Sequence, residues 1–457
     1  MEIQDFMRNA SEYQQILAAT NMGRQLVTGI NGSARTLLMA TMFMDQQQTQ
    51  LVVTDTAFHA GQLVNDLQNL LSDDQVYNFP AEEMLATEIA TSSPESRAER
   101  VQALHALQSD QPVIVVSDLA GLRRFLPQPA DFQAASLVIK AGGEYDMADL
   151  QVQLHKMGYG HEQLVARPGD YAVRGSIMDI YPLDADYPVR IDFFDTEVDS
   201  LRTFDPENQR SIDTIEQITI LPATEFIVDD DRLKAGKQKL QTQVDQQSET
   251  LTGEAKKALL AHFSVLLADD ATPSATPELG LYANLFYEQP AGLTDYLPKD
   301  ALVLVDDYSR LLDTDRRINE DEANWVTDRL RTHEMIPNQQ LGLDFRTVIR
   351  GVKQPQIFFS LFQKGMGNVR FNKLTNFVSR EMQKFFGQLP VLKSEVERWQ
   401  KQSQTVVIMV NSEDRISKVN DTLHDFGISA SLDKATNLTE GMVQVVPATL
   451  QNGFELP

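Results

Sequence analysis

The chain has 457 residues, 42% of them hydrophobic, which is enough for about three or four domains of roughly 100–150 residues, each with its own core. Its formal net charge of −25 argues against nucleic acid as the main partner, because gripping a DNA backbone needs clustered Lys and Arg. No local basic patch stands out. Cysteine is absent, which excludes disulfides and thiolate metal sites.

The sequence shows neither a transmembrane segment nor a secretory signal. No apolar run reaches the roughly 18 residues of a transmembrane helix, so no membrane partner is expected. The N-terminus, MEIQDFMRNA, starts acidic and has no apolar stretch of the kind a secretory signal needs. We therefore expect a cytoplasmic protein without a metal site.

Residues 1–130 read as an α/β unit. A strand is predicted over residues 25–29, a helix from about 34 to 43, and a second strand over 49–54. A third strand is predicted over 113–117. Strands that alternate with helices indicate a mostly parallel sheet.

The rest of the chain changes character twice. Residues 131–222 have dense strands and turn signals, which predicts a small inserted α+β domain. Residues 223–345 become helical again, with a polar helix around 233–267 and an apolar strand at 301–305, and are expected to complete the first domain. Residues 346–457, with strands near 356–360 and 405–410, are predicted to form a separate small α/β domain of unknown function. The predicted fold class is multidomain α/β.

One segment has the length of a phosphate-binding loop but not its chemistry. Residues 25–36 read QLVTGINGSART, so the segment from Gly29 to Thr36, with Gly32 inside it, has the length of the pattern G-x-x-x-x-G-K-[ST] between a strand and a helix. Ala34 stands where the second glycine belongs and crowds the backbone anion site. Arg35 replaces the lysine, and its larger, planar head is a poor substitute. We expect an inactive relic, although a helix N-terminus still attracts an anion weakly.

A second nucleotide-site element is also weak. The apolar strand LVLV at residues 302–305 ends in Asp306 and Asp307, the shape of a Walker B segment. ATPases of the helicase type place Asp and then Glu there, for magnesium and for the attacking water. Asp307 is one methylene shorter than that Glu. The plain alternative is a buried strand with a solvated acidic end.

The strand VRIDFF at residues 189–194 presents an unusual face. Side chains alternate along a strand, so Val189, Ile191 and Phe193 share a face that reads as core. Arg190 and Phe194 then share the opposite face, where a large aromatic is out of place. Aromatic residues and Arg are enriched at binding hot spots. The alternative is that Phe194 tucks under a loop and Arg190 pairs with a local acid such as Asp192; residues 144–225 hold 17 Asp and Glu against 6 Lys and Arg.

Two segments of the predicted inserted domain resemble a known family. The segments GDYAVRGSIMDIYP and PVRIDFFDTEVDSLRTFDP resemble the domain shared by UvrB and Mfd, the bacterial transcription-repair coupling factor. The resemblance extends over the whole chain to the closing GFELP. Two features favour the N-terminal, UvrB-like region of Mfd over UvrB itself. Ala34 and Arg35 replace the intact UvrB motif, and residues 79–97 have no tyrosine and are too short for UvrB's DNA-clamping hairpin.

The resemblance implies a function by binding. In this family the small inserted domain binds UvrA, the damage-recognition ATPase, and the contacting residues correspond to Arg174, Arg190 and Phe194. Arg174 is the least secure of the three because Gly175 can introduce a bulge. A full-length protein would continue past Pro457 and reach RNA polymerase and DNA through further domains, two of them an ATP-driven translocase. The sequence is therefore expected to be part of a longer protein.

For this part of the protein we expect UvrA recruitment by mimicry of UvrB, with no catalytic residue, no cofactor and no nucleotide hydrolysis. One alternative is an enzyme, a UvrB-like nucleotide-dependent DNA-loading protein, which ATP binding would reveal. The other is a DNA-binding module, which a clear basic footprint would support.

Overall fold

The protein is described here by a computed structural model covering residues 1–81, 94–273, 276–363, 366–385 and 387–456. Its largest element is a sheet of seven parallel strands in the order β15-β1-β14-β13-β2-β4-β3. This confirms the predicted α/β class and the mostly parallel sheet. The strands are β1 (Arg24–Thr28), β2 (Gln50–Thr54), β3 (Val76–Phe79), β4 (Ile114–Asp118), β13 (Leu302–Asp306), β14 (Gln356–Ser360) and β15 (Lys373–Asn376).

Helices cover both faces of this sheet, which is why its central strands are apolar throughout. Alternate residues of one strand enter different cores: Val27 packs with α3 and α4, whereas its neighbour Leu26 belongs to the core on the other face. One face carries α1 (Ile3–Arg8), α2 (Ser11–Ala18), α3 (Gly32–Gln46) and α4 (Ala57–Leu70). The other carries α5 (Pro94–Leu107), α6 (Leu119–Leu122), α12 (Tyr308–Arg331) and α13 (Phe345–Gly351).

The predicted domain boundary at residue 346 is wrong. Strand β14 lies between β1 and β13, and β15 adds to the far side of β1, so both belong to the large sheet. Residues 356–360 are buried on both faces, as a central strand requires. An apolar run indicates that a strand is buried but not which sheet it joins. For this reason the sequence pattern alone assigned residues 356–360 to the following domain.

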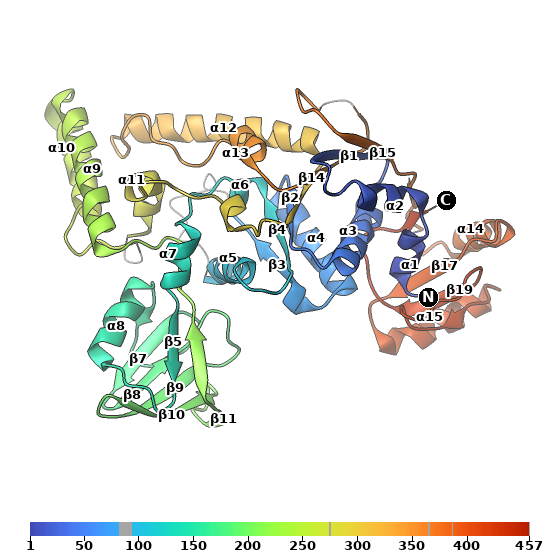
Figure 1. Cartoon of the computed structure of the whole chain (residues 1–457), viewed down its shortest axis with the longest axis horizontal. Coiled ribbons are helices and arrows are strands. Elements are labelled where there is room, and N and C mark those ends of the chain that lie inside the picture. The colour runs from blue at the N-terminus through green and yellow to red at the C-terminus, as the bar shows by residue number, and fades with distance from the viewer. Residues whose placement is uncertain (82–93, 274–275, 364–365, 386, 457) are drawn as a thin grey trace.

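The inserted domain follows as a separate α+β unit (Figure 1). Its six-stranded sheet has the order β11-β10-β9-β8-β7-β6, and a two-stranded ribbon of β5 and β12 carries the chain in and out. The elements are α7 (Pro129–Ala134), β5 (Leu137–Lys140), α8 (Met147–Lys156), β6 (Gly160–His161), β7 (Asp170–Arg174), β8 (Ile177–Ile180), β9 (Val189–Phe194), β10 (Glu197–Phe204), β11 (Ser211–Ile215) and β12 (Gln217–Ile220).

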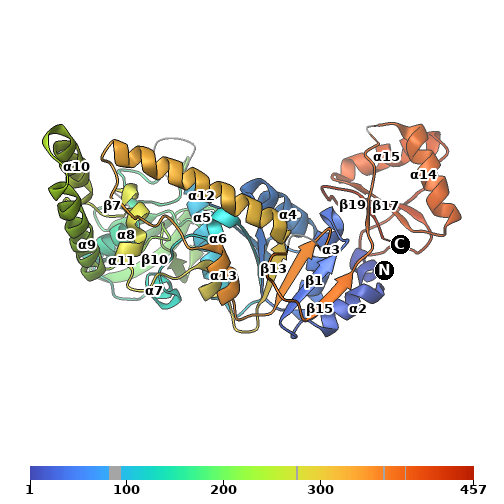
Figure 2. The same cartoon turned by 90° about the horizontal axis from the view of Figure 1, so that it is seen from above.

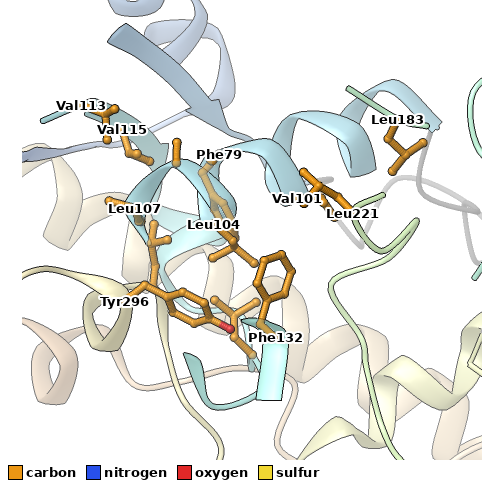
Figure 3. Packing of buried hydrophobic residues seen from close by; sticks show 14 of the residues in the cluster. Phe79, Val101, Leu104, Leu107, Val113, Val115, Phe132, Leu183, Leu221 and Tyr296 are labelled. Atoms are coloured by element: carbon orange, nitrogen blue, oxygen red, sulfur yellow. The ribbon is translucent and has the colours of Figure 1, made fainter. Parts of the chain in front are cut away.

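The inserted domain does not hang free, because its core is continuous with that of the large sheet. Leu183 and Leu221, from the inserted domain and its exit, belong to the same buried cluster as Val101 of α5, as Figure 3 shows. In the same cluster the rings of Phe132 and Tyr296 meet edge to face, with centroids 6.0 Å apart. Shared burial of this kind restrains how the inserted domain is presented to a partner.

A helical hairpin projects at one end of the molecule (Figure 1). The sequence predicted one polar helix around residues 233–267, but the structure has α9 (Asp230–Glu249) and α10 (Gly253–Leu266). The chain turns between them, and Gly253 adopts a φ of +61°, a left-handed conformation that suits glycine. Leu240 and Phe263 lie in the core that holds the two helices together. The short segments Pro277–Tyr282, α11 (Ala283–Phe286) and Leu293–Tyr296 then lead back to β13.

The C-terminal unit packs against the N-terminus of the chain (Figure 2). Its three parallel strands have the order β17-β19-β18, and the buried residues Leu438 and Val446 join the core of α1 and α3. The backbone of Met1 both donates to and accepts from Leu438, at 2.9 and 2.7 Å. The elements are β16 (Arg380–Glu381), α14 (Leu389–Lys401), β17 (Val406–Val410), α15 (Glu413–Asp425), β18 (Ser431–Leu432), β19 (Val443–Pro447) and β20 (Phe454–Glu455).

Candidate functional site

Phe194 is the most conspicuous side chain of the inserted domain. It is the last residue of β9 and is 78% exposed, whereas Val189, Ile191 and Phe193 are buried, as the alternation predicts. The turn that follows is tight, since Asp195 adopts a φ of +59° and Glu197 already pairs with Phe194. Strand pairing fixes the backbone that carries this ring, so a partner that covers it has only the side-chain rotation to restrict.

Arg190 lies on the outer face of β9 but is not free. Its Nε donates to one oxygen of Asp179 at 2.7 Å and its Nη2 to the other at 2.9 Å, a bidentate pair across β8 and β9. The guanidinium also stacks over the ring of Phe204, 4.3 Å from the centroid. Only 16% of the Arg190 side chain is exposed. Arg190 therefore pairs with a local acid, as the alternative interpretation expected, but the partner is Asp179 and not Asp192.

Arg174 joins the same carboxylate. Its Nη2 donates to Asp179 at 2.5 Å, while 43% of its side chain stays exposed. Asp179 itself is 1% exposed, so one buried carboxylate holds two guanidiniums from β7 and β9. Charge-assisted bonds of this kind fix the direction of a side chain more firmly than neutral ones do.

The structure adds a residue that sequence reasoning missed. Arg202 of β10 pairs with Asp192, which also accepts from Ser200 at 3.0 Å, and 38% of the Arg202 side chain is exposed. Arg202 lies directly opposite Arg190 in the register. A register shift between Val198 and Ser200 interrupts the alternation along β10, so counting residues does not place Arg202 on this face.

We call the outer face formed by Arg174, Arg190, Arg202 and Phe194 the arginine face. Asp179 and Asp192 each hold at least one of its guanidiniums, so three positive charges share two negative ones. Such a face orients its donors before a partner arrives. It suits an acidic or carboxylate-bearing partner that offers a pocket for one aromatic ring.

Most of the degenerate phosphate loop is helical, and later segments of the chain pack over it. Helix α3 already begins at Gly32, ahead of Arg35, and Ala34 and Thr36 are buried. The Ser33 hydroxyl donates to Asp66 at 2.7 Å and accepts from the backbone of Asn452 at 3.1 Å. A Cβ at Gly29 would lie 2.3 Å from the carbonyl oxygen of Phe377, so the chain crosses directly over the loop.

The two degenerate motifs meet in an ion pair. Nη1 of Arg35 lies 2.6 Å from Oδ1 of Asp306, and the two side chains are only 15% and 5% exposed. Asp306 also accepts from the Thr54 hydroxyl at 3.1 Å. Asp307 caps helix α12, with its carboxylate 3.3 Å from the backbone nitrogen of Arg310. The residues at the lysine position and at the first acidic position of the two motifs, Arg35 and Asp306, therefore pair with each other.

Three further predictions concern a metal site, a membrane-spanning helix and a DNA-clamping hairpin. Among the described residues, no group of three or more His, Cys, Asp or Glu side chains could hold a metal ion. No described helix is both long and apolar enough to cross a bilayer. The stretch over residues 79–97, predicted to be too short for a DNA-clamping hairpin, includes residues 82–93, which lie outside the described ranges.

Comparisons with known proteins agree with the predicted resemblance. Residues 137–226 match the UvrB interaction domain family. The whole chain is 32% identical to the transcription-repair-coupling factor of Bacillus subtilis (strain 168) and 28% identical to that of Staphylococcus haemolyticus (strain JCSC1435). It spans 39% of the length of each of these relatives. The resemblance to the UvrB-like N-terminal region of such factors is confirmed.

Proposed function

We propose that this chain is the UvrA-recruiting part of a transcription-repair coupling factor that acts in nucleotide excision repair. The observation that carries the proposal is Phe194, 78% exposed at the end of a strand in a domain that matches the UvrB interaction domain. Arg174 and Arg190 flank the same sheet face with guanidiniums that Asp179 already orients. An aromatic anchor beside ordered arginines is the composition of a binding hot spot.

The proposed mechanism is mimicry. The arginine face would present to UvrA the same kind of surface that UvrB presents, with Phe194 as anchor and the arginines as charge-assisted donors to UvrA carboxylates. The longer protein would bring UvrA to a stalled RNA polymerase through domains beyond this chain, which would also provide its DNA translocation. UvrB would later compete for the same UvrA surface. Such a protein would work in the cytoplasm.

Titration calorimetry of this chain with purified UvrA tests the proposal. We expect saturable binding, and we expect added UvrB to displace the chain, because both would occupy one surface. Binding that UvrB leaves unchanged would contradict mimicry while leaving recruitment intact. Absence of binding would contradict recruitment itself.

We further propose that the chain binds no nucleotide and needs no cofactor. Three arrangements support this: the Arg35–Asp306 ion pair, the use of the Ser33 hydroxyl by Asp66, and the crossing of Phe377 over Gly29. A nucleotide would have to break this largely buried ion pair and displace the segments around Phe377 and Asn452. The cost of separating a buried pair is several kcal/mol.

The expected result for a fluorescent ATP analogue is no saturable binding up to about 1 mM, which corresponds to a free energy of about −4 kcal/mol. The double substitution Ala34→Gly and Arg35→Lys should also fail to bind, because the covering segments stay in place. Intact UvrB serves as the positive control. Saturable micromolar binding by the unmodified chain would instead favour a UvrB-like, nucleotide-dependent DNA-loading protein.

A further inference from the structure

The positive charge of this acidic chain is unevenly distributed. Residues 345–394 contain nine Lys and Arg and a single acid, Glu381, in a protein whose net charge is −25. The expectation that no local basic patch stands out is therefore wrong. Averaging over the whole chain hides the segment, because the remaining residues are strongly acidic.

The fold gathers part of this charge at one edge of the large sheet. Strands β14, β1 and β15 are adjacent and parallel, so their N-terminal ends lie at the same edge. Arg24 begins β1 and Lys373 begins β15, one residue apart in the register. Arg370 precedes β15, and Lys353 precedes β14. Arg350 lies in the last turn of α13, where Nη2 of Arg24 reaches the carbonyl oxygen of Ile349 at 3.5 Å.

We call these five residues the basic edge. Neighbouring strands are about 4.8 Å apart, so the three strand ends span roughly 10 Å. Arg350, Lys353 and Arg370 are exposed, and Arg24 and Lys373 are half-buried. Within the described ranges none of the five forms an ion pair, in contrast to the arginine face, where each arginine has a carboxylate.

The edge has a clear limit. On the next strands along it acids appear, with Asp300 beside Lys299 before β13, Asp110 before β4 and Asp73 before β3. The basic edge itself, at the β14, β1 and β15 end, holds no acid among its five residues. In Figure 1 this end lies well away from the inserted domain, so the basic edge and the arginine face are separate surfaces.

We propose that the basic edge binds the phosphate backbone of double-stranded DNA. About 10 Å of duplex axis carries roughly six phosphate charges, so a patch of this width meets several phosphates at once. Lysine, arginine and amide side chains make most backbone contacts, and exposed Asn372 lies among these cations. A protein partner would call for an exposed aromatic anchor. The neighbouring Phe371 instead packs edge to face on Phe358, 5.4 Å between centroids.

We expect binding that does not depend on the DNA sequence and whose affinity falls steeply as the salt concentration rises. The acidic remainder of the chain opposes it, so we expect a Kd of about 10⁻⁵ M or weaker near physiological salt, within the usual range for non-specific binding. Affinity should rise sharply as salt falls, because each phosphate contact releases counterions. Binding of UvrA at the inserted domain is not required for it.

Fluorescence anisotropy with a labelled duplex of arbitrary sequence tests the proposal. The test variant combines Arg350→Ala, Lys353→Ala, Arg370→Ala and Lys373→Ala. The matched control removes four other cations, which are exposed and have no ion pair within the described residues: Lys234, Lys401, Lys418 and Lys434. Both variants lower the net charge by the same four units, so long-range repulsion changes equally in the two proteins.

For the test variant we expect at least a tenfold loss of affinity at low salt. The slope of log K against log salt should fall by about 3 to 4, since each lost contact contributes about 0.9 for a duplex. The control variant should keep the slope of the unmodified chain. Circular dichroism and UvrA binding should be unchanged in both, which shows that the variants are folded.

Three results would overturn the proposal. The unmodified chain could fail to bind duplex at low salt. The two variants could lose affinity equally, which would make the effect one of overall charge. Polyglutamate could displace the labelled duplex as effectively as unlabelled duplex does at equal charge concentration. That result would identify the edge as a site for an acidic protein.

Discussion

Replacing Phe194 by alanine is expected to weaken UvrA binding by at least about 2 kcal/mol, or roughly thirtyfold, while leaving the fold intact. The ring is 78% exposed, so its removal leaves no cavity in the free protein. Its loss would remove the apolar centre of the proposed interface. Titration calorimetry of the variant against UvrA measures the effect.

The chain offers a close control for this experiment. Phe362, in the loop after β14, is 73% exposed and lies in the large-sheet domain, outside the inserted domain. Phe362→Ala therefore makes the same chemical change at a matched exposure. Its affinity for UvrA should equal that of the unmodified chain. Equal affinities for the Phe194 and Phe362 variants would remove Phe194 from the interface.

Substitution of Arg190 tests the proposed interface less directly than substitution of Phe194 does. Arg190→Ala would leave the buried Asp179 with only Arg174 as a guanidinium partner among the described residues, so stability and binding would change together. Arg174 is more exposed than Arg190, and only one of its nitrogens donates to Asp179. A loss of affinity on Arg174→Ala is therefore easier to assign to the interface than the same loss at Arg190.

The largest expected effect on stability comes from Glu225, at the exit of the inserted domain. Its carboxylate accepts from Nε of Arg100 at 2.8 Å and from Arg124 at 2.6 Å, and Arg100 is fully buried in α5. Glu225→Gln would remove the charge of the carboxylate that the buried Arg100 guanidinium contacts, and breaking a buried ion pair costs about 3–5 kcal/mol. Because this cluster joins the inserted domain to α5, we also expect faster limited proteolysis of the residues near position 225.

Urea unfolding followed by circular dichroism measures the first effect, with midpoints compared between variants because several domains need not unfold in one step. The control is Lys156→Met, which breaks an exposed pair with Asp230 and should cost at most about 1 kcal/mol. A Glu225 variant as stable as the control would show that the buried cluster contributes nothing to the junction.

The same carboxylate predicts a dependence on pH. Burial alone would raise the pKa of Glu225, but Arg100 and Arg124 together lower it to about 2. A carboxyl group with a depressed pKa in the folded state stabilises the protein above its unfolded pKa and loses that contribution as the pH falls. The contribution should therefore decline between about pH 4.5 and pH 2. The Glu225→Gln variant should lack this part of the acid sensitivity.

The sequence by itself determined the local features. Alternation along residues 189–194 placed Phe194 outside and its neighbours inside, because the period of a strand depends only on its backbone. The pattern of strands and helices predicted the α/β class, and the missing lysine and glycine marked the phosphate loop as degenerate. Each of these rests on residues close together in the chain.

Only the tertiary structure decided which distant groups meet. It paired Arg35 with Asp306, gave Asp179 to both Arg174 and Arg190, and placed β14 and β15 in the large sheet. It also brought Arg24 beside cations more than 300 residues later in the chain. The physical reason is that strand order and side-chain pairing depend on long-range packing, which neither residue spacing nor charge counts encode.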